Sequence, residues 1–281
     1  MNHEQVRQLA LNTYFHSQKH FYHPQYMIYQ ETNENLLELF RYYDVKDKDV
    51  LSVLASSDQV LSCYYCGAKS IDTFDKVYLT LFYYYLRKWV ILYQKQLYPS
   101  HSFFESGDKN IYDLICQVRP TNIDEENAII FWKYYLELNQ FKADKYLFYL
   151  SIIKQPKPFG DSIDRIKGIF DKEISFTCMD FFKDTTIQKK YDVLLLSNIL
   201  EYASTQKQLY FARRNIESLL KDDGIAICTY LRNRDTSYAH KKEVHILTSH
   251  SLKLDGDNCT YYEPLWNDRI KLAYSYQLKK K

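Results

Sequence analysis

Short runs of consecutive apolar residues alternate with stretches of helical periodicity along most of the chain. The runs DVLSVLA at 49–55 and YDVLLL at 191–196 are too short for helices and predict buried strands. Further strands are expected at 69–74, 174–178 and 225–230. Uninterrupted apolar strands are typical of parallel sheets that are covered on both faces, so the pattern predicts an α/β fold.

Apolar residues at helical spacing fill the segments between these runs. Ser204 is a good N-cap for the helix that follows the YDVLLL strand. Two more strands are expected near the end of the chain, at 243–248 and 270–277. The helices between the strands are expected at 58–66, 77–97 and 204–220.

The same pattern divides the chain into segments. Residues 1–45 are predicted to form an N-terminal helical segment, and residues 46–281 an α/β domain. Between about 98 and 160 no run is typical of a strand, and aromatic and aliphatic residues recur at helical spacing. We therefore expect a mostly helical insertion there, forming a lid or an acceptor site.

Charge and composition narrow the function classes. The chain has 37 Lys and Arg against 35 Asp and Glu, a net charge of +2, which argues against a nucleic-acid partner. The N-terminus lacks the apolar core of a signal peptide, and Arg87 and Lys88 interrupt the longest apolar run, so no membrane span is predicted. A cytoplasmic location with reduced cysteines is expected. Cys63-x-x-Cys66 has no second pair, so no metal site is predicted.

The residues that follow each predicted strand are the candidates for chemistry, because ligands of open parallel sheets bind at the carboxyl ends of the strands. Ser56, Ser57 and Asp58 follow the first strand, where small residues lead into a helix N-terminus that suits a carboxylate. Asp75 follows the second strand, where an acid can accept hydrogen bonds from ribose hydroxyls.

Two more pairs follow later strands. Asp180 can accept from an exocyclic amine while Phe181 stacks on a flat base. Ser197 and Asn198 come directly after the YDVLLL strand. Together these residues predict a site for an adenosine that carries an amino-acid tail.

The order of these motifs resembles that of class I S-adenosylmethionine-dependent methyltransferases. YDVLLLSNILEY at 191–202 is similar to the FDVV-x-x-x-N-VLEH pattern of that superfamily, and 269–277 resembles its antiparallel last strand. The resemblance covers about 49–97 and 174–281. It implies a Rossmann-like, mostly parallel seven-stranded sheet with an antiparallel last strand, and S-adenosylmethionine as cofactor.

Carried over residue by residue, the resemblance also assigns roles. It implies that a loop of four residues lies near the methionine part, that one acid binds the ribose, that one pair lies at the adenine and that another faces the sulfonium and the acceptor. For catalysis it offers candidates by position only. The loop near the methionine part consists of Ala55, Ser56, Ser57 and Asp58, and the acid at the ribose is Asp75. The pair at the adenine is Asp180 and Phe181, and the pair that faces the sulfonium and the acceptor is Ser197 and Asn198. The candidates for catalysis are Asn198, Glu201 and Tyr202.

The first motif departs from the superfamily's pattern. A Gly-x-Gly pair is normal there, yet no glycine precedes Gly67. The serine-rich loop is similar to that of the aminocarboxypropyl transferases that build betaine lipids, which use the same cofactor. Three hypotheses follow: methyl transfer, favoured by a small margin; 3-amino-3-carboxypropyl transfer; and a non-catalytic binding protein on a decayed methyltransferase scaffold. The expected acceptor is a small molecule or a lipid, and the sequence leaves the oligomeric state open.

Overall fold

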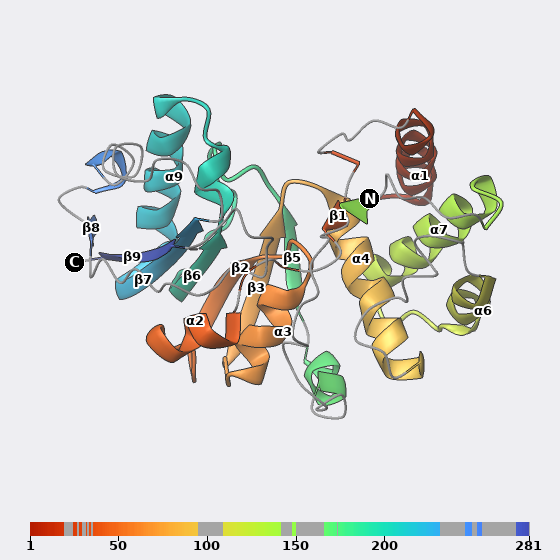
Figure 1. The fold of residues 1–281 in the computed structure, drawn as a ribbon, viewed down its shortest axis with the longest axis horizontal. Coiled ribbons are helices and arrows are strands. Elements are labelled where there is room, and N and C mark those ends of the chain that lie inside the picture. The colour runs from red at the N-terminus through yellow and green to blue at the C-terminus, as the bar shows by residue number, and fades with distance from the viewer. Residues whose placement is uncertain are drawn as a thin grey trace, which may run out of the picture.

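A seven-stranded sheet with helices on its faces forms one side of the molecule, and a group of helices forms the other (Figure 1). The computed structural model describes residues 1–19, 25–26, 28–29, 32, 34, 36–94, 109–141, 148–149, 166–172, 174–230, 245–248, 252–254 and 274–280.

The strand order of the sheet is β5-β3-β2-β6-β7-β9-β8. β9 runs antiparallel to both of its neighbours, whereas β5, β3, β2, β6 and β7 are mutually parallel. This order confirms the predicted Rossmann-like class and reverses between β2 and β6, which makes that pair the topological switch point. The strands are β2 (Asp49–Val53), β3 (Ser70–Asp75), β5 (Ser175–Cys178), β6 (Tyr191–Ser197), β7 (Leu220–Tyr230), β8 (Leu252–Leu254) and β9 (Tyr274–Lys280).

The central strands are apolar throughout because both of their faces are covered. Val50 pairs with Val193, and both belong to the larger hydrophobic cluster. Leu51 pairs with Leu194, and both belong to the smaller cluster on the opposite face. Since side chains of a strand alternate between the faces, a sheet with two covered faces requires the continuous apolar runs of the sequence.

Different helices cover the two faces. Leu39 and Val60 contribute to the larger cluster, and Ile216 contributes to the smaller one. α9 therefore lies on the face opposite to α2 and α3. These helices are α2 (Leu36–Tyr42), α3 (Asp58–Tyr65) and α9 (Gln206–Leu219).

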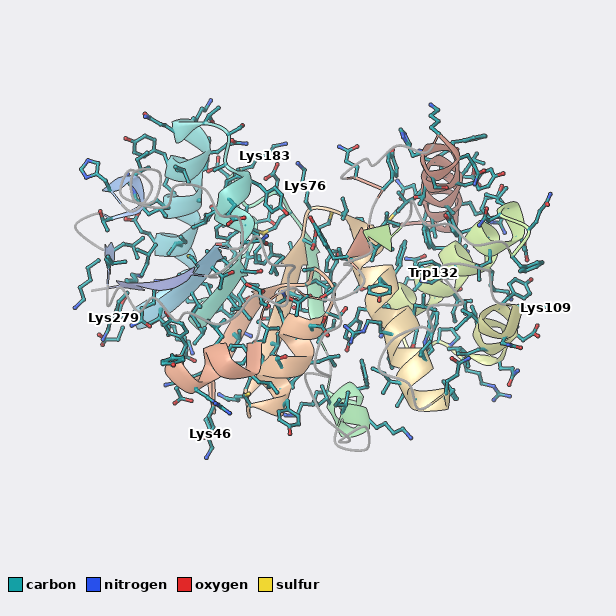
Figure 2. The ribbon with its side chains drawn as sticks, in the orientation of Figure 1. Lys46, Lys76, Lys109, Trp132, Lys183 and Lys279 are labelled. Atoms are coloured by element: carbon teal, nitrogen blue, oxygen red, sulfur yellow. The ribbon has the colours of Figure 1, made fainter. Side chains whose placement is uncertain are left out.

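The helices beside the sheet form what we call the helical lobe. Within it α7 packs against α1, α4 and α6 (Figure 1). The indole of Trp132, labelled in Figure 2, donates from Nε1 to the Phe82 carbonyl at 2.8 Å and ties α7 to α4. No helix among the described residues has the length and apolar character of a membrane span. The lobe consists of α1 (His3–Gln18), α4 (Tyr78–Trp89), which continues as a π-helix (Val90–Gln94), α6 (Lys109–Gln117) and α7 (Ile123–Leu138).

The two helices of segment 1–45 therefore pack in different places: α1 contacts α7, and α2 contacts α3. The predicted insertion at 98–160 is helical in α6 and α7, but it also holds β4 (Phe148–Tyr149), where no strand was expected. β4 pairs in parallel with β1 (Ile28–Tyr29). Two residues are too few for a recognisable alternation in the sequence. Residues 95–108, 142–147 and 150–165 lie outside the described residues.

Two other predicted elements are wrong in place. Residues 245–247 form a helical turn, and the expected strand at 243–248 is replaced by β8 at Leu252–Leu254. α9 is capped by Thr205 rather than Ser204: the Thr205 hydroxyl accepts from the Gln208 N–H at 3.3 Å in a capping box. The sequence pattern cannot distinguish Ser204 from Thr205 as the N-cap, because both carry a hydroxyl group. Only the backbone geometry shows which residue caps the helix.

Candidate functional site

The loop after β2 turns through two left-handed residues. Ala55 has φ 43° and Ser57 has φ 74°, a region that favours glycine. The Ser57 N–H donates to the Leu54 carbonyl at 2.7 Å and closes the turn. Each such residue costs about 1–2 kcal/mol relative to a right-handed conformation. The loop thus makes the kind of turn that glycines normally make, with small side chains instead.

Asp75 ends β3 directly beside this loop. Its Oδ2 accepts from the Ala55 N–H at 3.1 Å, and its Oδ1 accepts from the Val77 N–H at 3.3 Å. Burial raises the pKa of this carboxyl to about 6, against the lowering effect of its hydrogen bonds. No cationic side chain of the described residues pairs with it. An ionised Asp75 can accept further hydrogen bonds from ligand hydroxyls at this edge.

Asp58 holds the same loop from inside. Its carboxylate pairs with the Arg87 guanidinium of α4 at 3.0 Å, and both side chains are fully buried. Arg87 also donates to the Ser56 carbonyl at 2.6 Å. The Ser56 hydroxyl and the Thr32 N–H donate to Asp58 Oδ2 at 2.8 and 2.7 Å. Asp58, predicted to lie near the methionine part of the cofactor, thus already has a cationic partner within the chain.

Glu34 lies at the carboxyl ends of β6 and β7. Its Oε2 accepts from Ser197 Oγ at 2.7 Å and from Gln59 Nε2 at 2.9 Å, and its Oε1 accepts from the Thr229 hydroxyl. The side chain of Glu34 is 2% exposed. Burial raises its pKa, although the donors around it lower it. A carboxyl group therefore sits beside Ser197, one of the predicted site residues.

The two residues predicted to contact adenine follow β5, the neighbour of β3. The Phe181 ring is buried and stacks on Phe74 with a centroid distance of 5.2 Å. Asp180 accepts from the Phe182 N–H at 3.1 Å, and its other oxygen lies 3.8 Å from Lys76 Nζ. Asp180 is within reach of the edge, whereas Phe181 is part of the core. Their role in binding adenine stays a prediction.

Two of the catalytic candidates, Glu201 and Tyr202, lie in a 3₁₀ turn after β6, at Ile199–Tyr202, and the third, Asn198, is its N-cap residue. The Glu201 N–H donates to the Asn198 carbonyl at 3.1 Å. Tyr202 is 44% exposed, and its hydroxyl lies 2.9 Å from that of Tyr29 in β1. Tyr202 is thus accessible at the surface, and the catalytic roles of these residues stay predictions.

The structure brings the loop after β2, Asp75 and Ser197 to one edge of the sheet, and their roles in binding stay predictions. Sequence reasoning missed Glu34, Gln59 and Arg87. Arg87 had a signal, because a charge inside an apolar helix requires a buried partner. Glu34 and Gln59 had none, since nothing in the pattern around either residue marks its side chain, and both lie far from Ser197 in the sequence.

Two further observations bear on what the edge can bind. The Ser57 hydroxyl is fully buried and makes no hydrogen bond within the described part of the chain. No group of three or more His, Cys, Asp or Glu side chains that could hold a metal ion occurs among the described residues. The polar side chains described at this part of the edge include the acids Glu34 and Asp75, the hydroxyls of Ser57 and Ser197, and the amide of Gln59.

Comparisons with known proteins give structural likeness only. No protein-family model matches the chain, and no curated protein matches it. The N-methyltransferase NodS from Bradyrhizobium japonicum WM9 is similar in structure, with TM-score 0.43 and 12% identity over 88% of this chain and 93% of that chain. A TehB-like SAM-dependent methyltransferase from Corynebacterium glutamicum has TM-score 0.43 and 9% identity over 88% of each chain.

The glycopeptide N-methyltransferase MtfA, complexed with S-adenosyl-L-homocysteine, has TM-score 0.46 and 6% identity over 90% of this chain and 92% of that chain. At such identities and TM-scores these likenesses carry no weight for the chemistry. The fold class accordingly rests on the strand order, and the site on its own residues.

Proposed function

We propose that this protein is an S-adenosylmethionine-dependent transferase, and most simply a methyltransferase, whose acceptor is a small molecule or a lipid. One observation carries the proposal: beside the switch point of the sheet, Asp75 at the end of β3 accepts a hydrogen bond from the Ala55 N–H of the loop after β2. An acid at the end of the second parallel strand, next to a tight turn after the first, suits a nucleoside.

The residues of this edge fit such a ligand. Asp75 would accept hydrogen bonds from the ribose hydroxyls. Ser57 has a buried hydroxyl without a hydrogen-bond partner among the described residues. The left-handed Ala55 and Ser57 give the loop the backbone conformation that glycines usually adopt in such a turn. Asp180 would serve the adenine amine, and Ser197 and Asn198 would face the acceptor.

When bound, S-adenosylmethionine supplies an electrophilic carbon on a cationic sulfur. The chain's contribution is to bind and orient, because placing two reactants in line lowers a barrier without further chemistry. Asp75 and the loop after β2 would fix the nucleoside end. Asn198, Glu201 and Tyr202, which follow β6, are the candidates for contact with the acceptor.

A second candidate is transfer of the 3-amino-3-carboxypropyl group of the same cofactor. It is favoured by the Ser56-Ser57-Asp58 sequence of the loop, which carries serines and an acid where methyltransferases of this superfamily carry glycines. Asp58 of this loop forms a buried ion pair with Arg87, which a Gly-x-Gly loop could not form because glycine has no side chain. A non-catalytic binding protein on the same scaffold is the third hypothesis.

Calorimetric titration with S-adenosylmethionine tests the proposal, with Asp75→Asn as the matched variant. We expect binding by the wild-type chain and weaker binding by the variant. Incubation with cofactor and candidate acceptors, followed by mass analysis, then separates the reactions: S-adenosylhomocysteine marks methyl transfer, and methylthioadenosine marks aminocarboxypropyl transfer. Binding without turnover would favour the non-catalytic protein, and no binding at all would refute the proposal.

A further inference from the structure

Glu34 is a buried acid without a cationic partner in the described part of the chain. All four of its side-chain donors are neutral: three hydroxyls and one amide. Its nearest buried counterpart, Asp58, is paired with Arg87, so the chain does neutralise charge where the loop needs it. An ionised carboxylate buried among neutral groups is costly. The difference between the two acids points to a cation that the described residues do not provide.

Gln59 gives a second, independent observation at the same place. Its Nε2 donates to Glu34 Oε2 at 2.9 Å and to Thr32 Oγ1 at 3.3 Å, which fixes the orientation of the amide. Its Oε1 is then buried without a hydrogen-bond donor among the described residues, in a side chain that is 2% exposed. Buried acceptors are rarely left unpaired in native proteins, so a donor is missing here.

A group that is positively charged and donates hydrogen bonds would satisfy both side chains. An alkylammonium meets both requirements, because it carries a fixed charge and several N–H donors and has no acceptor. A sulfonium carries the charge but has no hydrogen to donate. The position at the carboxyl ends of β6 and β7, where Ser197 and Thr229 also contact Glu34, is the edge at which ligands of this fold bind.

We infer that Glu34 and Gln59 form a subsite for an ammonium group of the bound ligand. This inference rests on the proposed function and deepens it. Two ammonium groups could occupy the subsite: the α-ammonium of the cofactor's amino-acid tail, or an amine at the reacting centre, as an amine acceptor would present. The chemistry is the same, and the choice of ligands in the test separates the two.

The experiment measures the dissociation constants of three nucleosides by calorimetry. Methylthioadenosine has no ammonium, S-adenosylhomocysteine has one in its tail, and sinefungin has a second one in place of the sulfonium. With wild-type protein we expect each useful ammonium to strengthen binding by about tenfold or more, equal to about 1.4 kcal/mol. Glu34→Gln, which keeps the size of the side chain, should abolish that gain.

The pattern of loss identifies the ammonium. A loss of the gain from methylthioadenosine to S-adenosylhomocysteine assigns the subsite to the tail, and a loss of the gain from S-adenosylhomocysteine to sinefungin assigns it to the reacting centre. Unchanged ratios in Glu34→Gln would overturn the inference, since glutamine mimics a neutral, protonated Glu34. If no nucleoside binds to the wild-type chain, the proposed function fails, and the inference fails with it.

Two other variants guard against a merely structural effect. Glu125 is also 2% exposed, but it lies in the helical lobe with Lys88 as its cation at 3.2 Å. Glu125→Gln should therefore leave the ligand ratios unchanged, even if it costs stability. Gln59→Met, which removes the unpaired oxygen but keeps the acid, should reduce the ammonium gain in part. This second variant keeps the test decisive if Glu34→Gln does not fold.

Discussion

Two neighbouring regions of the sheet edge hold their acids in opposite ways. In the first region Asp58 is fully buried and paired with the Arg87 guanidinium at 3.0 Å. In the second region Glu34 and Asp75, which we call the edge acids, receive hydrogen bonds only from neutral groups of the described residues. Burial raises the pKa of both edge acids, that of Asp75 to about 6.

The difference between the two regions indicates that Asp58 supports the structure of the loop, whereas the edge acids are candidates for ligand binding. The ion pair joins the loop after β2 to α4. Because Asp58 and Arg87 neutralise each other's charge, neither is available to pair with a charged ligand. The edge acids have no cationic partner among the described residues, and they lie at the place where the fold binds ligands. Charge that a chain buries without neutralising it is a sign of function more than of stability.

The largest expected effect comes from breaking the ion pair. Arg87→Met leaves Asp58 charged and buried, and this should lower the free energy of unfolding by about 3–5 kcal/mol. Urea denaturation at neutral pH measures it. Arg214→Met is the control, because Arg214 forms an exposed pair with Asp184 and should cost only about 0–1 kcal/mol. Equal losses in the two variants would contradict a structural role for the buried pair.

The next effect concerns binding at Asp75. Asp75→Asn removes a charged acceptor of ligand hydroxyls and should weaken nucleoside binding by about 1.5–3 kcal/mol, as measured by calorimetry. The matched control is Asp72→Asn on the same strand, whose carboxylate pairs with Lys189 at 2.7 Å. We expect no change of affinity in the control. An Asp75→Asn protein that binds as tightly as the wild type would remove Asp75 from the site.

The pH dependence of that binding sharpens the same point. The hydroxyls of a ligand donate to the ionised carboxylate, so protonation of Asp75 opposes binding. With a pKa of about 6 in the free protein, affinity should fall by about tenfold between pH 7 and pH 5. Titrations of a nucleoside at several pH values measure this, and the profile of Asp75→Asn should be flat over the same range.

A smaller effect is expected when the free energy of unfolding is compared between a variant of Glu34 and a variant of Asp58. The pKa of Glu34 is raised in the folded state, so its ionisation opposes folding as pH rises. Glu34→Gln should therefore raise the free energy of unfolding at neutral pH by up to about 1 kcal/mol. The gain should vanish at low pH, where Glu34 is protonated in both states. Asp58→Asn should instead destabilise at neutral pH, and a similar loss in Glu34→Gln would contradict the comparison.

The smallest effect comes from the loop itself. Ser57 has φ 74°, and its hydroxyl makes no hydrogen bond within the described residues. Ser57→Gly should therefore relieve strain and stabilise the chain by about 0.5 kcal/mol. Ser62→Gly in α3 is the control and should cost about 0.5 kcal/mol. Thermal unfolding compares the two, and destabilisation by Ser57→Gly would show that the serine side chain supports the turn.

Local pattern and tertiary contact contributed differently to this site. The end of each parallel strand was predictable, because apolar runs stop where the chain leaves the covered sheet, and Asp75 and Ser197 were proposed as site residues on that ground. Gln59 belongs to α3, whose position was also predicted, yet nothing in the periodicity distinguishes its amide from any other polar side chain. Its partner Glu34 is 25 residues away in the sequence.

From the sequence alone one could predict the five parallel strands, the helices between them, the two covered faces of the sheet, and the small residues after β2. This is possible because burial on a strand or a helix imposes a period that neighbouring residues share. The tertiary structure was needed to show that Asp58 forms an ion pair with Arg87, whereas Glu34 accepts hydrogen bonds from hydroxyls and an amide. Such pairings depend on side chains from separate elements, and the energy that selects them arises only when folding removes water from all of them together.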